Sequence, residues 1–191
     1  MRKEDLIFLH APSVYDFRKE SMFYGPVSDL VPSTPVFEMY PFGFTTMANA
    51  LHKAGYKVRI VNIASMMLND KKLDVEALLQ KLDADVFGID LHWLPHAHGS
   101  LAVAEIVKRY HPDSKVLFGG FSSSYYHEEL ITYPQVDLVL RGDSVEKPLV
   151  TLMDALAQKR DLSSVPNLTW KDKGRSVVNA LTHVPNDLDY L

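Results

Sequence analysis

The segment of residues 90–99 collects side chains that commonly bind metals or transfer protons. It reads Asp90-Leu91-His92-Trp93-Leu94-Pro95-His96-Ala97-His98-Gly99. Imidazole and carboxylate groups at this density suit a divalent metal or a general base, so a metal-dependent hydrolase is one hypothesis. Pro95 disfavours a helix that would align two of the histidines, and the alternative is polar residues around a helix start, with His98 or Ser100 near the cap. The candidate metal ligands are Asp90, His92, His96 and His98.

Two further segments have residue types suited to binding a ligand. Gly119-Gly120-Phe121-Ser122-Ser123-Ser124 combines glycines, which let the backbone approach a ligand closely, with hydroxyls that bind phosphate or ribose oxygens. Two glycines are also common in an ordinary turn. Arg141-Gly142-Asp143-Ser144-Val145-Glu146 opens a predicted helix, in which Asp143 or Ser144 is the cap and Glu146 closes a capping box.

A long segment, residues 11–44, is rich in proline and aromatic residues. Connections of this length are usually functional or interaction surfaces. The alternative is a lid packed on the core of its own domain. A flavodoxin-like module that binds a flavin or a protein partner through this segment is a further hypothesis. Its aromatic residues are Tyr15, Phe17, Phe23, Tyr24, Phe37, Tyr40, Phe42 and Phe44.

The elements that position these segments are five short apolar runs separated by stretches of helical periodicity. Most runs are apolar on both faces, as in the strands of a covered parallel sheet, and the second alternates more, which places it nearer an edge. Strands that alternate with helices predict βαβ units. We therefore predict an α/β, Rossmann-like (flavodoxin-like) fold with a doubly wound five-stranded parallel sheet. The predicted strands are residues 6–9, 58–63, 86–89, 115–118 and 136–140.

Amphipathic spacing predicts the intervening helices. One ends at Gly55, and a shorter one is capped by Asp74. Their apolar stripes are Met47, Ala50, Leu51 and Ala54; Leu78 and Leu82; Val103, Ile106, Val107 and Tyr110; and Leu149, Leu152, Met153 and Leu156.

Beyond the last helix, residues 168–170 and 176–178 flank a polar turn that contains Gly174. This pattern predicts a small hairpin. We expect an α/β domain over residues 1–160, followed at residues 161–191 by the hairpin and a linker toward a missing downstream domain.

Composition excludes several classes of protein. The 191 residues include 20 basic and 24 acidic side chains, with a net charge of -4, and no basic cluster suggests binding to nucleic acid or to an anionic membrane. The chain contains no cysteine, which excludes disulfides, cysteine nucleophiles and an iron–sulfur cluster held by this chain. No apolar stretch is long enough to span a membrane, and the acidic start does not match a secretory signal, so we expect a cytoplasmic protein.

The carboxyl ends of parallel strands share one edge of a sheet, so these polar segments are expected to converge there. Their order resembles the N-terminal cobalamin-binding domain of cobalamin-dependent radical SAM enzymes. The resemblance covers about residues 5–180. The elements that carry it are residues 40–44 leading into residues 54–58, then Asp85-Val86-Phe87-Gly88-Ile89, Lys115-Val116-Leu117-Phe118-Gly119-Gly120, and Asp137-Leu138-Val139-Leu140-Arg141-Gly142-Asp143 with Glu146.

This resemblance implies a corrinoid lying across the carboxyl edge of the sheet, with its nucleotide tail running toward the Gly119-Gly120 segment. It also implies that the parent enzyme uses S-adenosylmethionine and a [4Fe-4S] cluster in a radical SAM domain. The present chain would then bind cobalamin without catalysing a reaction itself. The implied cofactor-binding residues are Ala11, Pro12, Ser13, Leu91, His92, Trp93, Gly119, Gly120, Phe121, Ser122, Gly142 and Glu146.

The sequence departs from the wider cobalamin-binding pattern after the first strand. The Asp-x-His-x-x-Gly motif that ligates cobalt through histidine is absent there. Asp90-Leu91-His92 resembles the beginning of that motif but follows the third strand, and Pro95 stands where glycine would be. The resemblance therefore does not imply a histidine ligand to cobalt.

Overall fold

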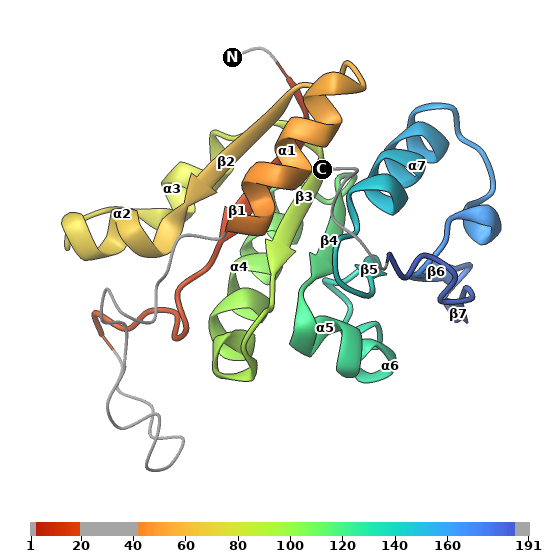
Figure 1. Cartoon of the computed structure of the whole chain (residues 1–191). Coiled ribbons are helices and arrows are strands. Elements are labelled where there is room, and N and C mark those ends of the chain that lie inside the picture. Colours follow the sequence, from red (N-terminus) through yellow and green to blue (C-terminus); the bar gives the residue numbers. More distant parts are fainter. Residues whose placement is uncertain (1–2, 20–41, 186–191) are drawn as a thin grey trace.

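The computed structural model describes residues 3–19 and 42–185. These residues form one sheet of seven strands in the order β2-β1-β3-β4-β5-β6-β7 (Figure 1). Among the described residues, no helix is both long and apolar enough to cross a membrane. The strands are β1 (Glu4–His10), β2 (Val58–Asn62), β3 (Ala84–Asp90), β4 (Lys115–Gly119), β5 (Leu138–Leu140), β6 (Leu168–Asp172) and β7 (Arg175–Val178).

Five of the strands are parallel, which confirms the predicted doubly wound sheet. β1 lies between β2 and β3, and β4 and β5 continue the sheet on the far side of β3. Leu6 to Leu9 are buried in β1, whereas β2 is only partly buried and lies at the outer edge, as its alternating pattern predicts. Apolar residues on both faces of the central strands pack against helices on both sides of the sheet.

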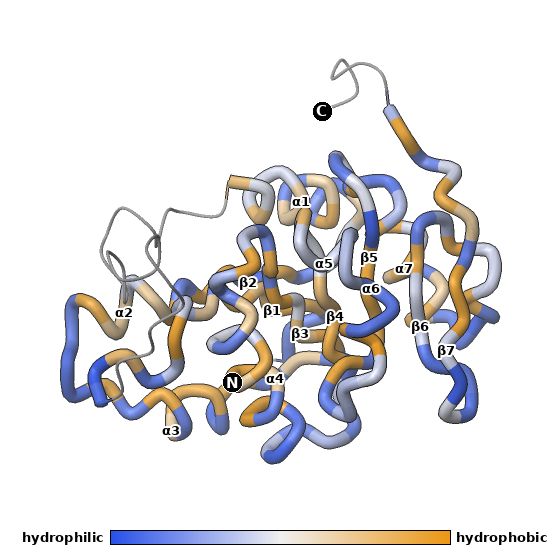
Figure 2. The backbone as a smooth tube through the Cα atoms, turned by 90° about the horizontal axis from the view of Figure 1, so that it is seen from below, coloured by the Kyte–Doolittle hydropathy of each residue, from blue (hydrophilic) through white to orange (hydrophobic). Residues whose placement is uncertain are grey.

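The helices divide into two groups, one on each face of the sheet. Figure 2 shows α1 and α4 on opposite sides of the apolar strands. Helices α1 and α7 form one core with Leu6, Phe8 and Leu140, while α2, α3, α4 and α6 pack on the other face. The helices are α1 (Phe42–Lys53), α2 (Ile63–Asn69), α3 (Val75–Gln80), α4 (Ala97–Tyr110), α5 (Phe121–Tyr125), α6 (His127–Leu130) and α7 (Glu146–Ala157), with single turns η1 (Leu94–His96) and η2 (Leu162–Ser164).

Local capping explains several boundaries. Asp74 caps α3 by accepting a hydrogen bond from the amide of Ala77 at 2.9 Å, as predicted. Gly55 follows α1 with a positive φ of 93°, which is consistent with its predicted role in ending the helix. The capping box predicted for α7 is wrong, because its N-cap is Val145, which makes no side-chain cap bond, and the carboxylate of Glu146 bonds elsewhere.

The predicted hairpin is present and is part of the main sheet. β6 pairs antiparallel with β5, and β7 pairs antiparallel with β6. Val165 and Leu168 are fully buried and belong to the core beneath α7. The hairpin therefore covers the edge of β5, which is only three residues long.

Candidate functional site

The order of the parallel strands reverses between β1 and β3, because β2 is added on one side of β1 and β3 on the other. At such a switch point the connections leave toward opposite faces and open a crevice at the carboxyl ends of the strands. His10 ends β1 and Asp90 ends β3. Their side chains meet there, with His10 Nδ1 and Asp90 Oδ2 2.8 Å apart.

A pocket of about 360 Å³ opens beside this pair, on the face of the sheet that α1 and α7 cover. Its walls are largely apolar, and the rings of Phe8 and Phe44 stack with centroids 4.4 Å apart. A largely apolar pocket with a few polar groups is typical of a cofactor site. The lining residues are Phe8, His10, Phe42, Gly43, Phe44, Met47, Gly88, Ile89, Asp90, His92, Trp93, His96, Leu117, Phe118, Gly119, Gly120, Leu140, Val145 and Leu149.

Glycines form one side of the pocket. Gly120 has a φ of 109°, and a Cβ there would lie 2.9 Å from the amide nitrogen of His92, so the loops after β3 and β4 touch through this residue. A Cβ on Gly119 would meet only the carbonyl oxygen of Leu140, at 3.8 Å. A Cβ atom at position 119 would therefore occupy pocket space without displacing protein atoms.

The histidines of residues 90–99 do not converge. His92 packs against Phe121 with ring centroids 4.7 Å apart, whereas His96 is buried with its ring 5.9 Å from that of His10. His98 Nδ1 accepts a hydrogen bond from the backbone amide of Tyr15 at 3.3 Å. Within residues 3–19 and 42–185, no group of three or more His, Cys, Asp or Glu side chains could hold a metal ion. The described structure gives no support to the predicted hydrolase site, since the turn η1 separates the side chains.

Exposed aromatic side chains form a rim beside the pocket. Trp93 is 55% exposed and Phe121 is 57% exposed, and the ring of His92 contacts both. The loops that carry them are held together, because Ser122 Oγ donates to the carbonyl of His92 at 3.1 Å. Two of the segments singled out in the sequence, after β3 and after β4, therefore meet at one place. Gly142, in the segment after β5, donates its amide to Ser124 Oγ at 2.9 Å.

The residues directly after β1 lie away from the pocket. Ala11, Pro12 and Ser13 are buried, and a Cβ on Gly99 would lie 1.7 Å from the carbonyl oxygen of Pro12. Gly99 also donates its amide to the carbonyl of Ser13 at 3.1 Å. This contact positions the start of α4 against the loop. The remaining aromatic segment, residues 20–41, lies outside the described residues.

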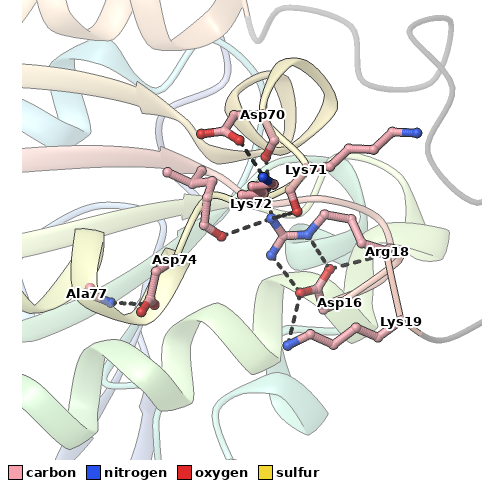
Figure 3. A network of polar contacts seen from close by, with 9 residues as sticks. Asp16, Arg18, Lys19, Asp70, Lys71, Lys72, Asp74 and Ala77 are labelled. Carbon is pink, nitrogen blue, oxygen red and sulfur yellow. Dashed lines mark hydrogen bonds and ion pairs between the residues drawn. The ribbon is translucent and has the colours of Figure 1, made fainter.

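Arg18 holds the described part of that loop against the turn between α2 and α3 (Figure 3). Its guanidinium group donates to both carboxylate oxygens of Asp16, at 2.8 and 2.7 Å, and to the carbonyl of Leu73 at 2.9 Å. The hydrogen bond from Arg18 holds the pKa of Asp16 below its ordinary value, against the opposing effect of burial. The path of the chain after β1 is thereby fixed at residue 18.

Glu146 connects the two helices that wall the pocket. Thr46 Oγ1 in α1 lies 2.6 Å from Glu146 Oε1 at the start of α7. Glu146 is buried, and within the described chain its second oxygen, Oε2, has no hydrogen-bond partner. Thr46 and Glu146 are the sequence neighbours of the pocket residues Met47 and Val145. Their hydrogen bond therefore fixes the distance between α1 and α7 beside the pocket.

Residues 29–148 match the family model described as the B12 binding domain. The chain belongs to this family. The match covers more than half of the chain and includes α1, β3 and the Gly119-Gly120 turn. This family membership gives no support to the hypotheses of a metal-dependent hydrolase or a flavin-binding module.

Curated relatives of this B12-binding domain are methyl-transferring enzymes. Hopanoid C-3 methylase of Methylococcus capsulatus is 26% identical over 141 residues, covering 71% of this chain and 26% of the relative. Cytidylyl-2-hydroxyethylphosphonate methyltransferase of Streptomyces wedmorensis is 24% identical over 184 residues, covering 84% of this chain and 34% of the relative. The chain thus spans about a quarter to a third of the length of these relatives.

Solved structures share the fold. The radical S-adenosylmethionine methyltransferase TsrM from Kitasatospora setae superposes with a TM-score of 0.70 at 16% identity, over 96% of this chain and 31% of TsrM. The cobalamin-dependent S-adenosylmethionine radical enzyme OxsB gives a TM-score of 0.66 at 15% identity, over 96% of this chain and 23% of OxsB. The Rossmann-like architecture predicted from the sequence is the one these proteins share.

The sequence identifies the loops around the pocket but not several of the residues that line it. His10 was detectable as a polar residue that ends an apolar strand, and Gly88 as a glycine inside a strand, where its Cβ would lie 2.7 Å from the ring of Phe8. Phe8 and Met47 carry no such indication, and Phe44 is indicated only as one of the aromatic residues of the segment 11–44. They are ordinary apolar residues of a strand and a helix, and only the packing of α1 makes them a pocket wall.

Proposed function

We propose that this chain is the cobalamin-binding module of a larger radical SAM enzyme and that it holds the nucleotide tail of the corrinoid in the pocket beside β1 and β3. The observation that carries the proposal is the pocket at the switch point, formed in a chain that belongs to the B12-binding family. The parent enzyme would also contain S-adenosylmethionine and a [4Fe-4S] cluster, since a structure of TsrM holds a [4Fe-4S] cluster and one of OxsB holds S-adenosylmethionine.

The pocket fits one part of a corrinoid. A corrin ring with its amide side chains is larger than a volume of about 360 Å³, whereas a flat aromatic base with its ribose fits between apolar walls. Phe8 and Phe44 supply aromatic surface for such a base. Gly119 leaves the space that the tail needs.

The corrin ring would then lie outside the pocket, over the exposed rim of His92, Trp93 and Phe121. Bound cobalamin would supply alkyl-transfer or radical chemistry at its cobalt. The residues of this chain would bind the tail, orient the ring and exclude water from one of its faces. The other face would remain open to the radical SAM domain of the parent chain.

The proposal also covers the partners of the chain and its location in the cell. A cobalamin-binding module of this kind needs neither nucleic acid nor a membrane, which agrees with the balanced charge of the chain. We expect it to act in the cytoplasm. The division of the chain into residues 1–160 and 161–191 likewise remains a prediction.

The test is retention of hydroxocobalamin after reconstitution and exhaustive desalting, measured from the corrinoid absorbance. Two substitutions of graded size probe the pocket. Gly119→Ala should retain most of the corrinoid, and Gly119→Leu should lose it, because the larger side chain fills the space of the tail. Equal melting temperatures would show that both variants fold. Equal corrinoid retention by Gly119→Leu and the wild type would contradict the proposed position of the tail.

A further inference from the structure

The pocket has one strongly polar wall, and Asp90 carries its negative charge. Asp90 Oδ2 accepts a hydrogen bond from His10 Nδ1 at 2.8 Å. Its other oxygen, Oδ1, is enclosed by protein and has no hydrogen-bond partner among the described residues. An enclosed carboxylate oxygen without a donor is unfavourable. The hydrogen-bonding capacity of this side chain is therefore only partly used by the protein.

His10 pairs with this carboxylate, and the other basic side chains of the described pocket wall are those of His92 and His96. The lining contains no lysine or arginine within residues 3–19 and 42–185. The remaining surface is mainly apolar, with Phe8, Leu117 and Leu149 among its side chains. Against such a surface, a single polar group in the wall strongly affects which ligand binds, because the ligand must donate a hydrogen bond where the wall accepts one.

The position of the carboxylate is fixed by its surroundings. Asp90 stands directly opposite Gly119 in the pairing of β3 with β4. Ser100 Oγ, from α4, donates to the carbonyl oxygen of Asp90 at 2.9 Å. The side chain is 15% exposed and lines the pocket beside the space that Gly119 leaves open. A base bound in this space would lie against the carboxylate.

The bases found in corrinoids differ in what they offer to a carboxylate. Dimethylbenzimidazole presents methyl groups and a ring nitrogen with a lone pair, and it offers a donor only after that nitrogen is protonated. Adenine presents an exocyclic amino group, which donates hydrogen bonds. Two acceptors placed against each other repel, whereas an amino group would donate to the part of the Asp90 carboxylate that the pocket exposes, since Oδ1 itself is enclosed by protein.

We propose that Asp90 makes this pocket select corrinoids whose lower base carries an N–H or O–H donor, such as adenine, over cobalamin with its dimethylbenzimidazole base. This inference rests on the proposed function, because it assumes that the nucleotide tail occupies the pocket. It adds a preference among corrinoids, and it makes Asp90 a residue that determines specificity.

The experiment compares three corrinoids on the full chain by absorbance titration. They are cobalamin, the corrinoid with adenine as its lower base, and cobinamide, which lacks the nucleotide. We expect the wild type to bind the adenine form at least about tenfold more tightly than cobalamin, as one well-placed charged hydrogen bond would give. Cobinamide should bind most weakly.

The decisive variant is Asp90→Asn, which keeps the size of the side chain and adds an amide donor. Its N–H group can donate to the lone pair of dimethylbenzimidazole, so the preference should shift toward cobalamin and the ratio of the two affinities should fall to about one. The matched control is Asp85→Asn on the same strand, where the carboxylate is 62% exposed and pairs with Lys3. This control should leave the ratio unchanged.

The outcomes separate the two proposals. Equal wild-type affinities for cobalamin and the adenine form, or tighter binding of cobalamin, would overturn the role of Asp90 and leave the cobalamin site intact. Failure to bind any of the three corrinoids would overturn the proposed function itself. If Asp90→Asn does not fold, as judged by thermal unfolding, the wild-type ratio alone decides the question.

Discussion

Asp16 and Arg18 form an ion pair whose side chains are only 7% and 12% exposed. Replacing Arg18 with Gln should lower the free energy of unfolding by about 3 kcal/mol at pH 7, because it leaves a buried carboxylate with only the exposed Lys19, at 3.7 Å, as a charged partner. Since the pKa of Asp16 is lowered in the folded state, its contribution is present above its unfolded pKa and is lost as the pH falls through the folded value. The difference between wild type and variant should therefore shrink at about pH 3.

Urea unfolding at both pH values measures this difference. Arg59→Gln is the matched control, because Arg59 is exposed on β2 and should change stability by less than about 0.5 kcal/mol. A loss that is the same at both pH values would show that Arg18 acts only through its bonds to backbone carbonyls such as that of Leu73.

The sequence identifies a residue of the site where its residue type is unusual for its position. It does not identify a residue whose role depends on a partner distant in sequence. Gly119 and His92 were selected from the sequence, and both line the pocket. The local sequence predicts Glu146 as a capping residue and the family resemblance implies it as a cofactor-binding residue, but its bond to Thr46 joins positions a hundred residues apart and leaves no local pattern. His10 forms its pair with Asp90 only because β1 and β3 are adjacent.

Helices α1 and α7 depend on one another through the bond between Thr46 and Glu146. Thr46→Val should remove the donor from a buried carboxylate and destabilise the protein by about 1–3 kcal/mol. Because these helices wall the pocket, corrinoid retention should fall as well. Thermal unfolding and desalting after reconstitution measure the two effects.

The neighbouring threonine provides the control. Thr45 Oγ1 donates to the carbonyl of Phe42 on the same helix and, within the described chain, makes no hydrogen bond to α7, so Thr45→Val should retain corrinoid like the wild type. If both variants lose corrinoid equally, the bond between the helices is not what sets the width of the pocket.

Tyr56, at the turn between α1 and β2, also bonds α7. Its hydroxyl lies 2.5 Å from Asp154 Oδ1, and burial together with this carboxylate raises its pKa to about 12. A raised pKa favours the protonated phenol in the folded state, so the stabilisation is complete below about pH 10 and is lost as the pH rises toward 12. Tyr56→Phe should cost about 1 kcal/mol at pH 7.

Absorbance of ionised tyrosine during alkaline titration checks this assignment. The curve of the wild type minus that of Tyr56→Phe should contain one late component with a midpoint of about 12. A midpoint near 10 in this difference would contradict the bond to Asp154.

The sequence predicts those helices and strands whose buried apolar residues recur at regular spacing. Strands such as β3 and β4 are apolar on both faces, and α4 buries one regular stripe, so their periodicity identifies them. Helices α5 and α6 were not predicted, because each is five residues or fewer and polar in sequence. Short elements of this kind are determined by the loops they join.

At the scale of the whole molecule, the hairpin and the parallel sheet should unfold together. A chain that ends at residue 160 loses Val165 and Leu168, which are fully buried, and exposes the edge of β5. We expect it to melt well below the full chain or to aggregate. Circular dichroism during heating measures this, and a truncated chain that melts like the full one would favour a domain boundary at residue 160.

The sequence predicts the hairpin but not its partner strand. The two runs and Gly174 specify a local turn, whereas the pairing of β6 with β5 depends on contacts between distant parts of the chain. A pattern of period two identifies a strand without identifying its neighbour. The order of the strands, and with it the location of the pocket, follows from that tertiary pairing.

The two outermost strands, β2 and β7, are five and four residues long. Each carries an exposed cation, Arg59 on β2 and Arg175 on β7. Short edges with exposed positive charges are poor templates for an added strand, because a second copy would bring like charges together. The sheet that presents the pocket is thus protected at both sides from edge-to-edge growth, and replacing these arginines with apolar β-branched residues would be expected to promote fibrous aggregation.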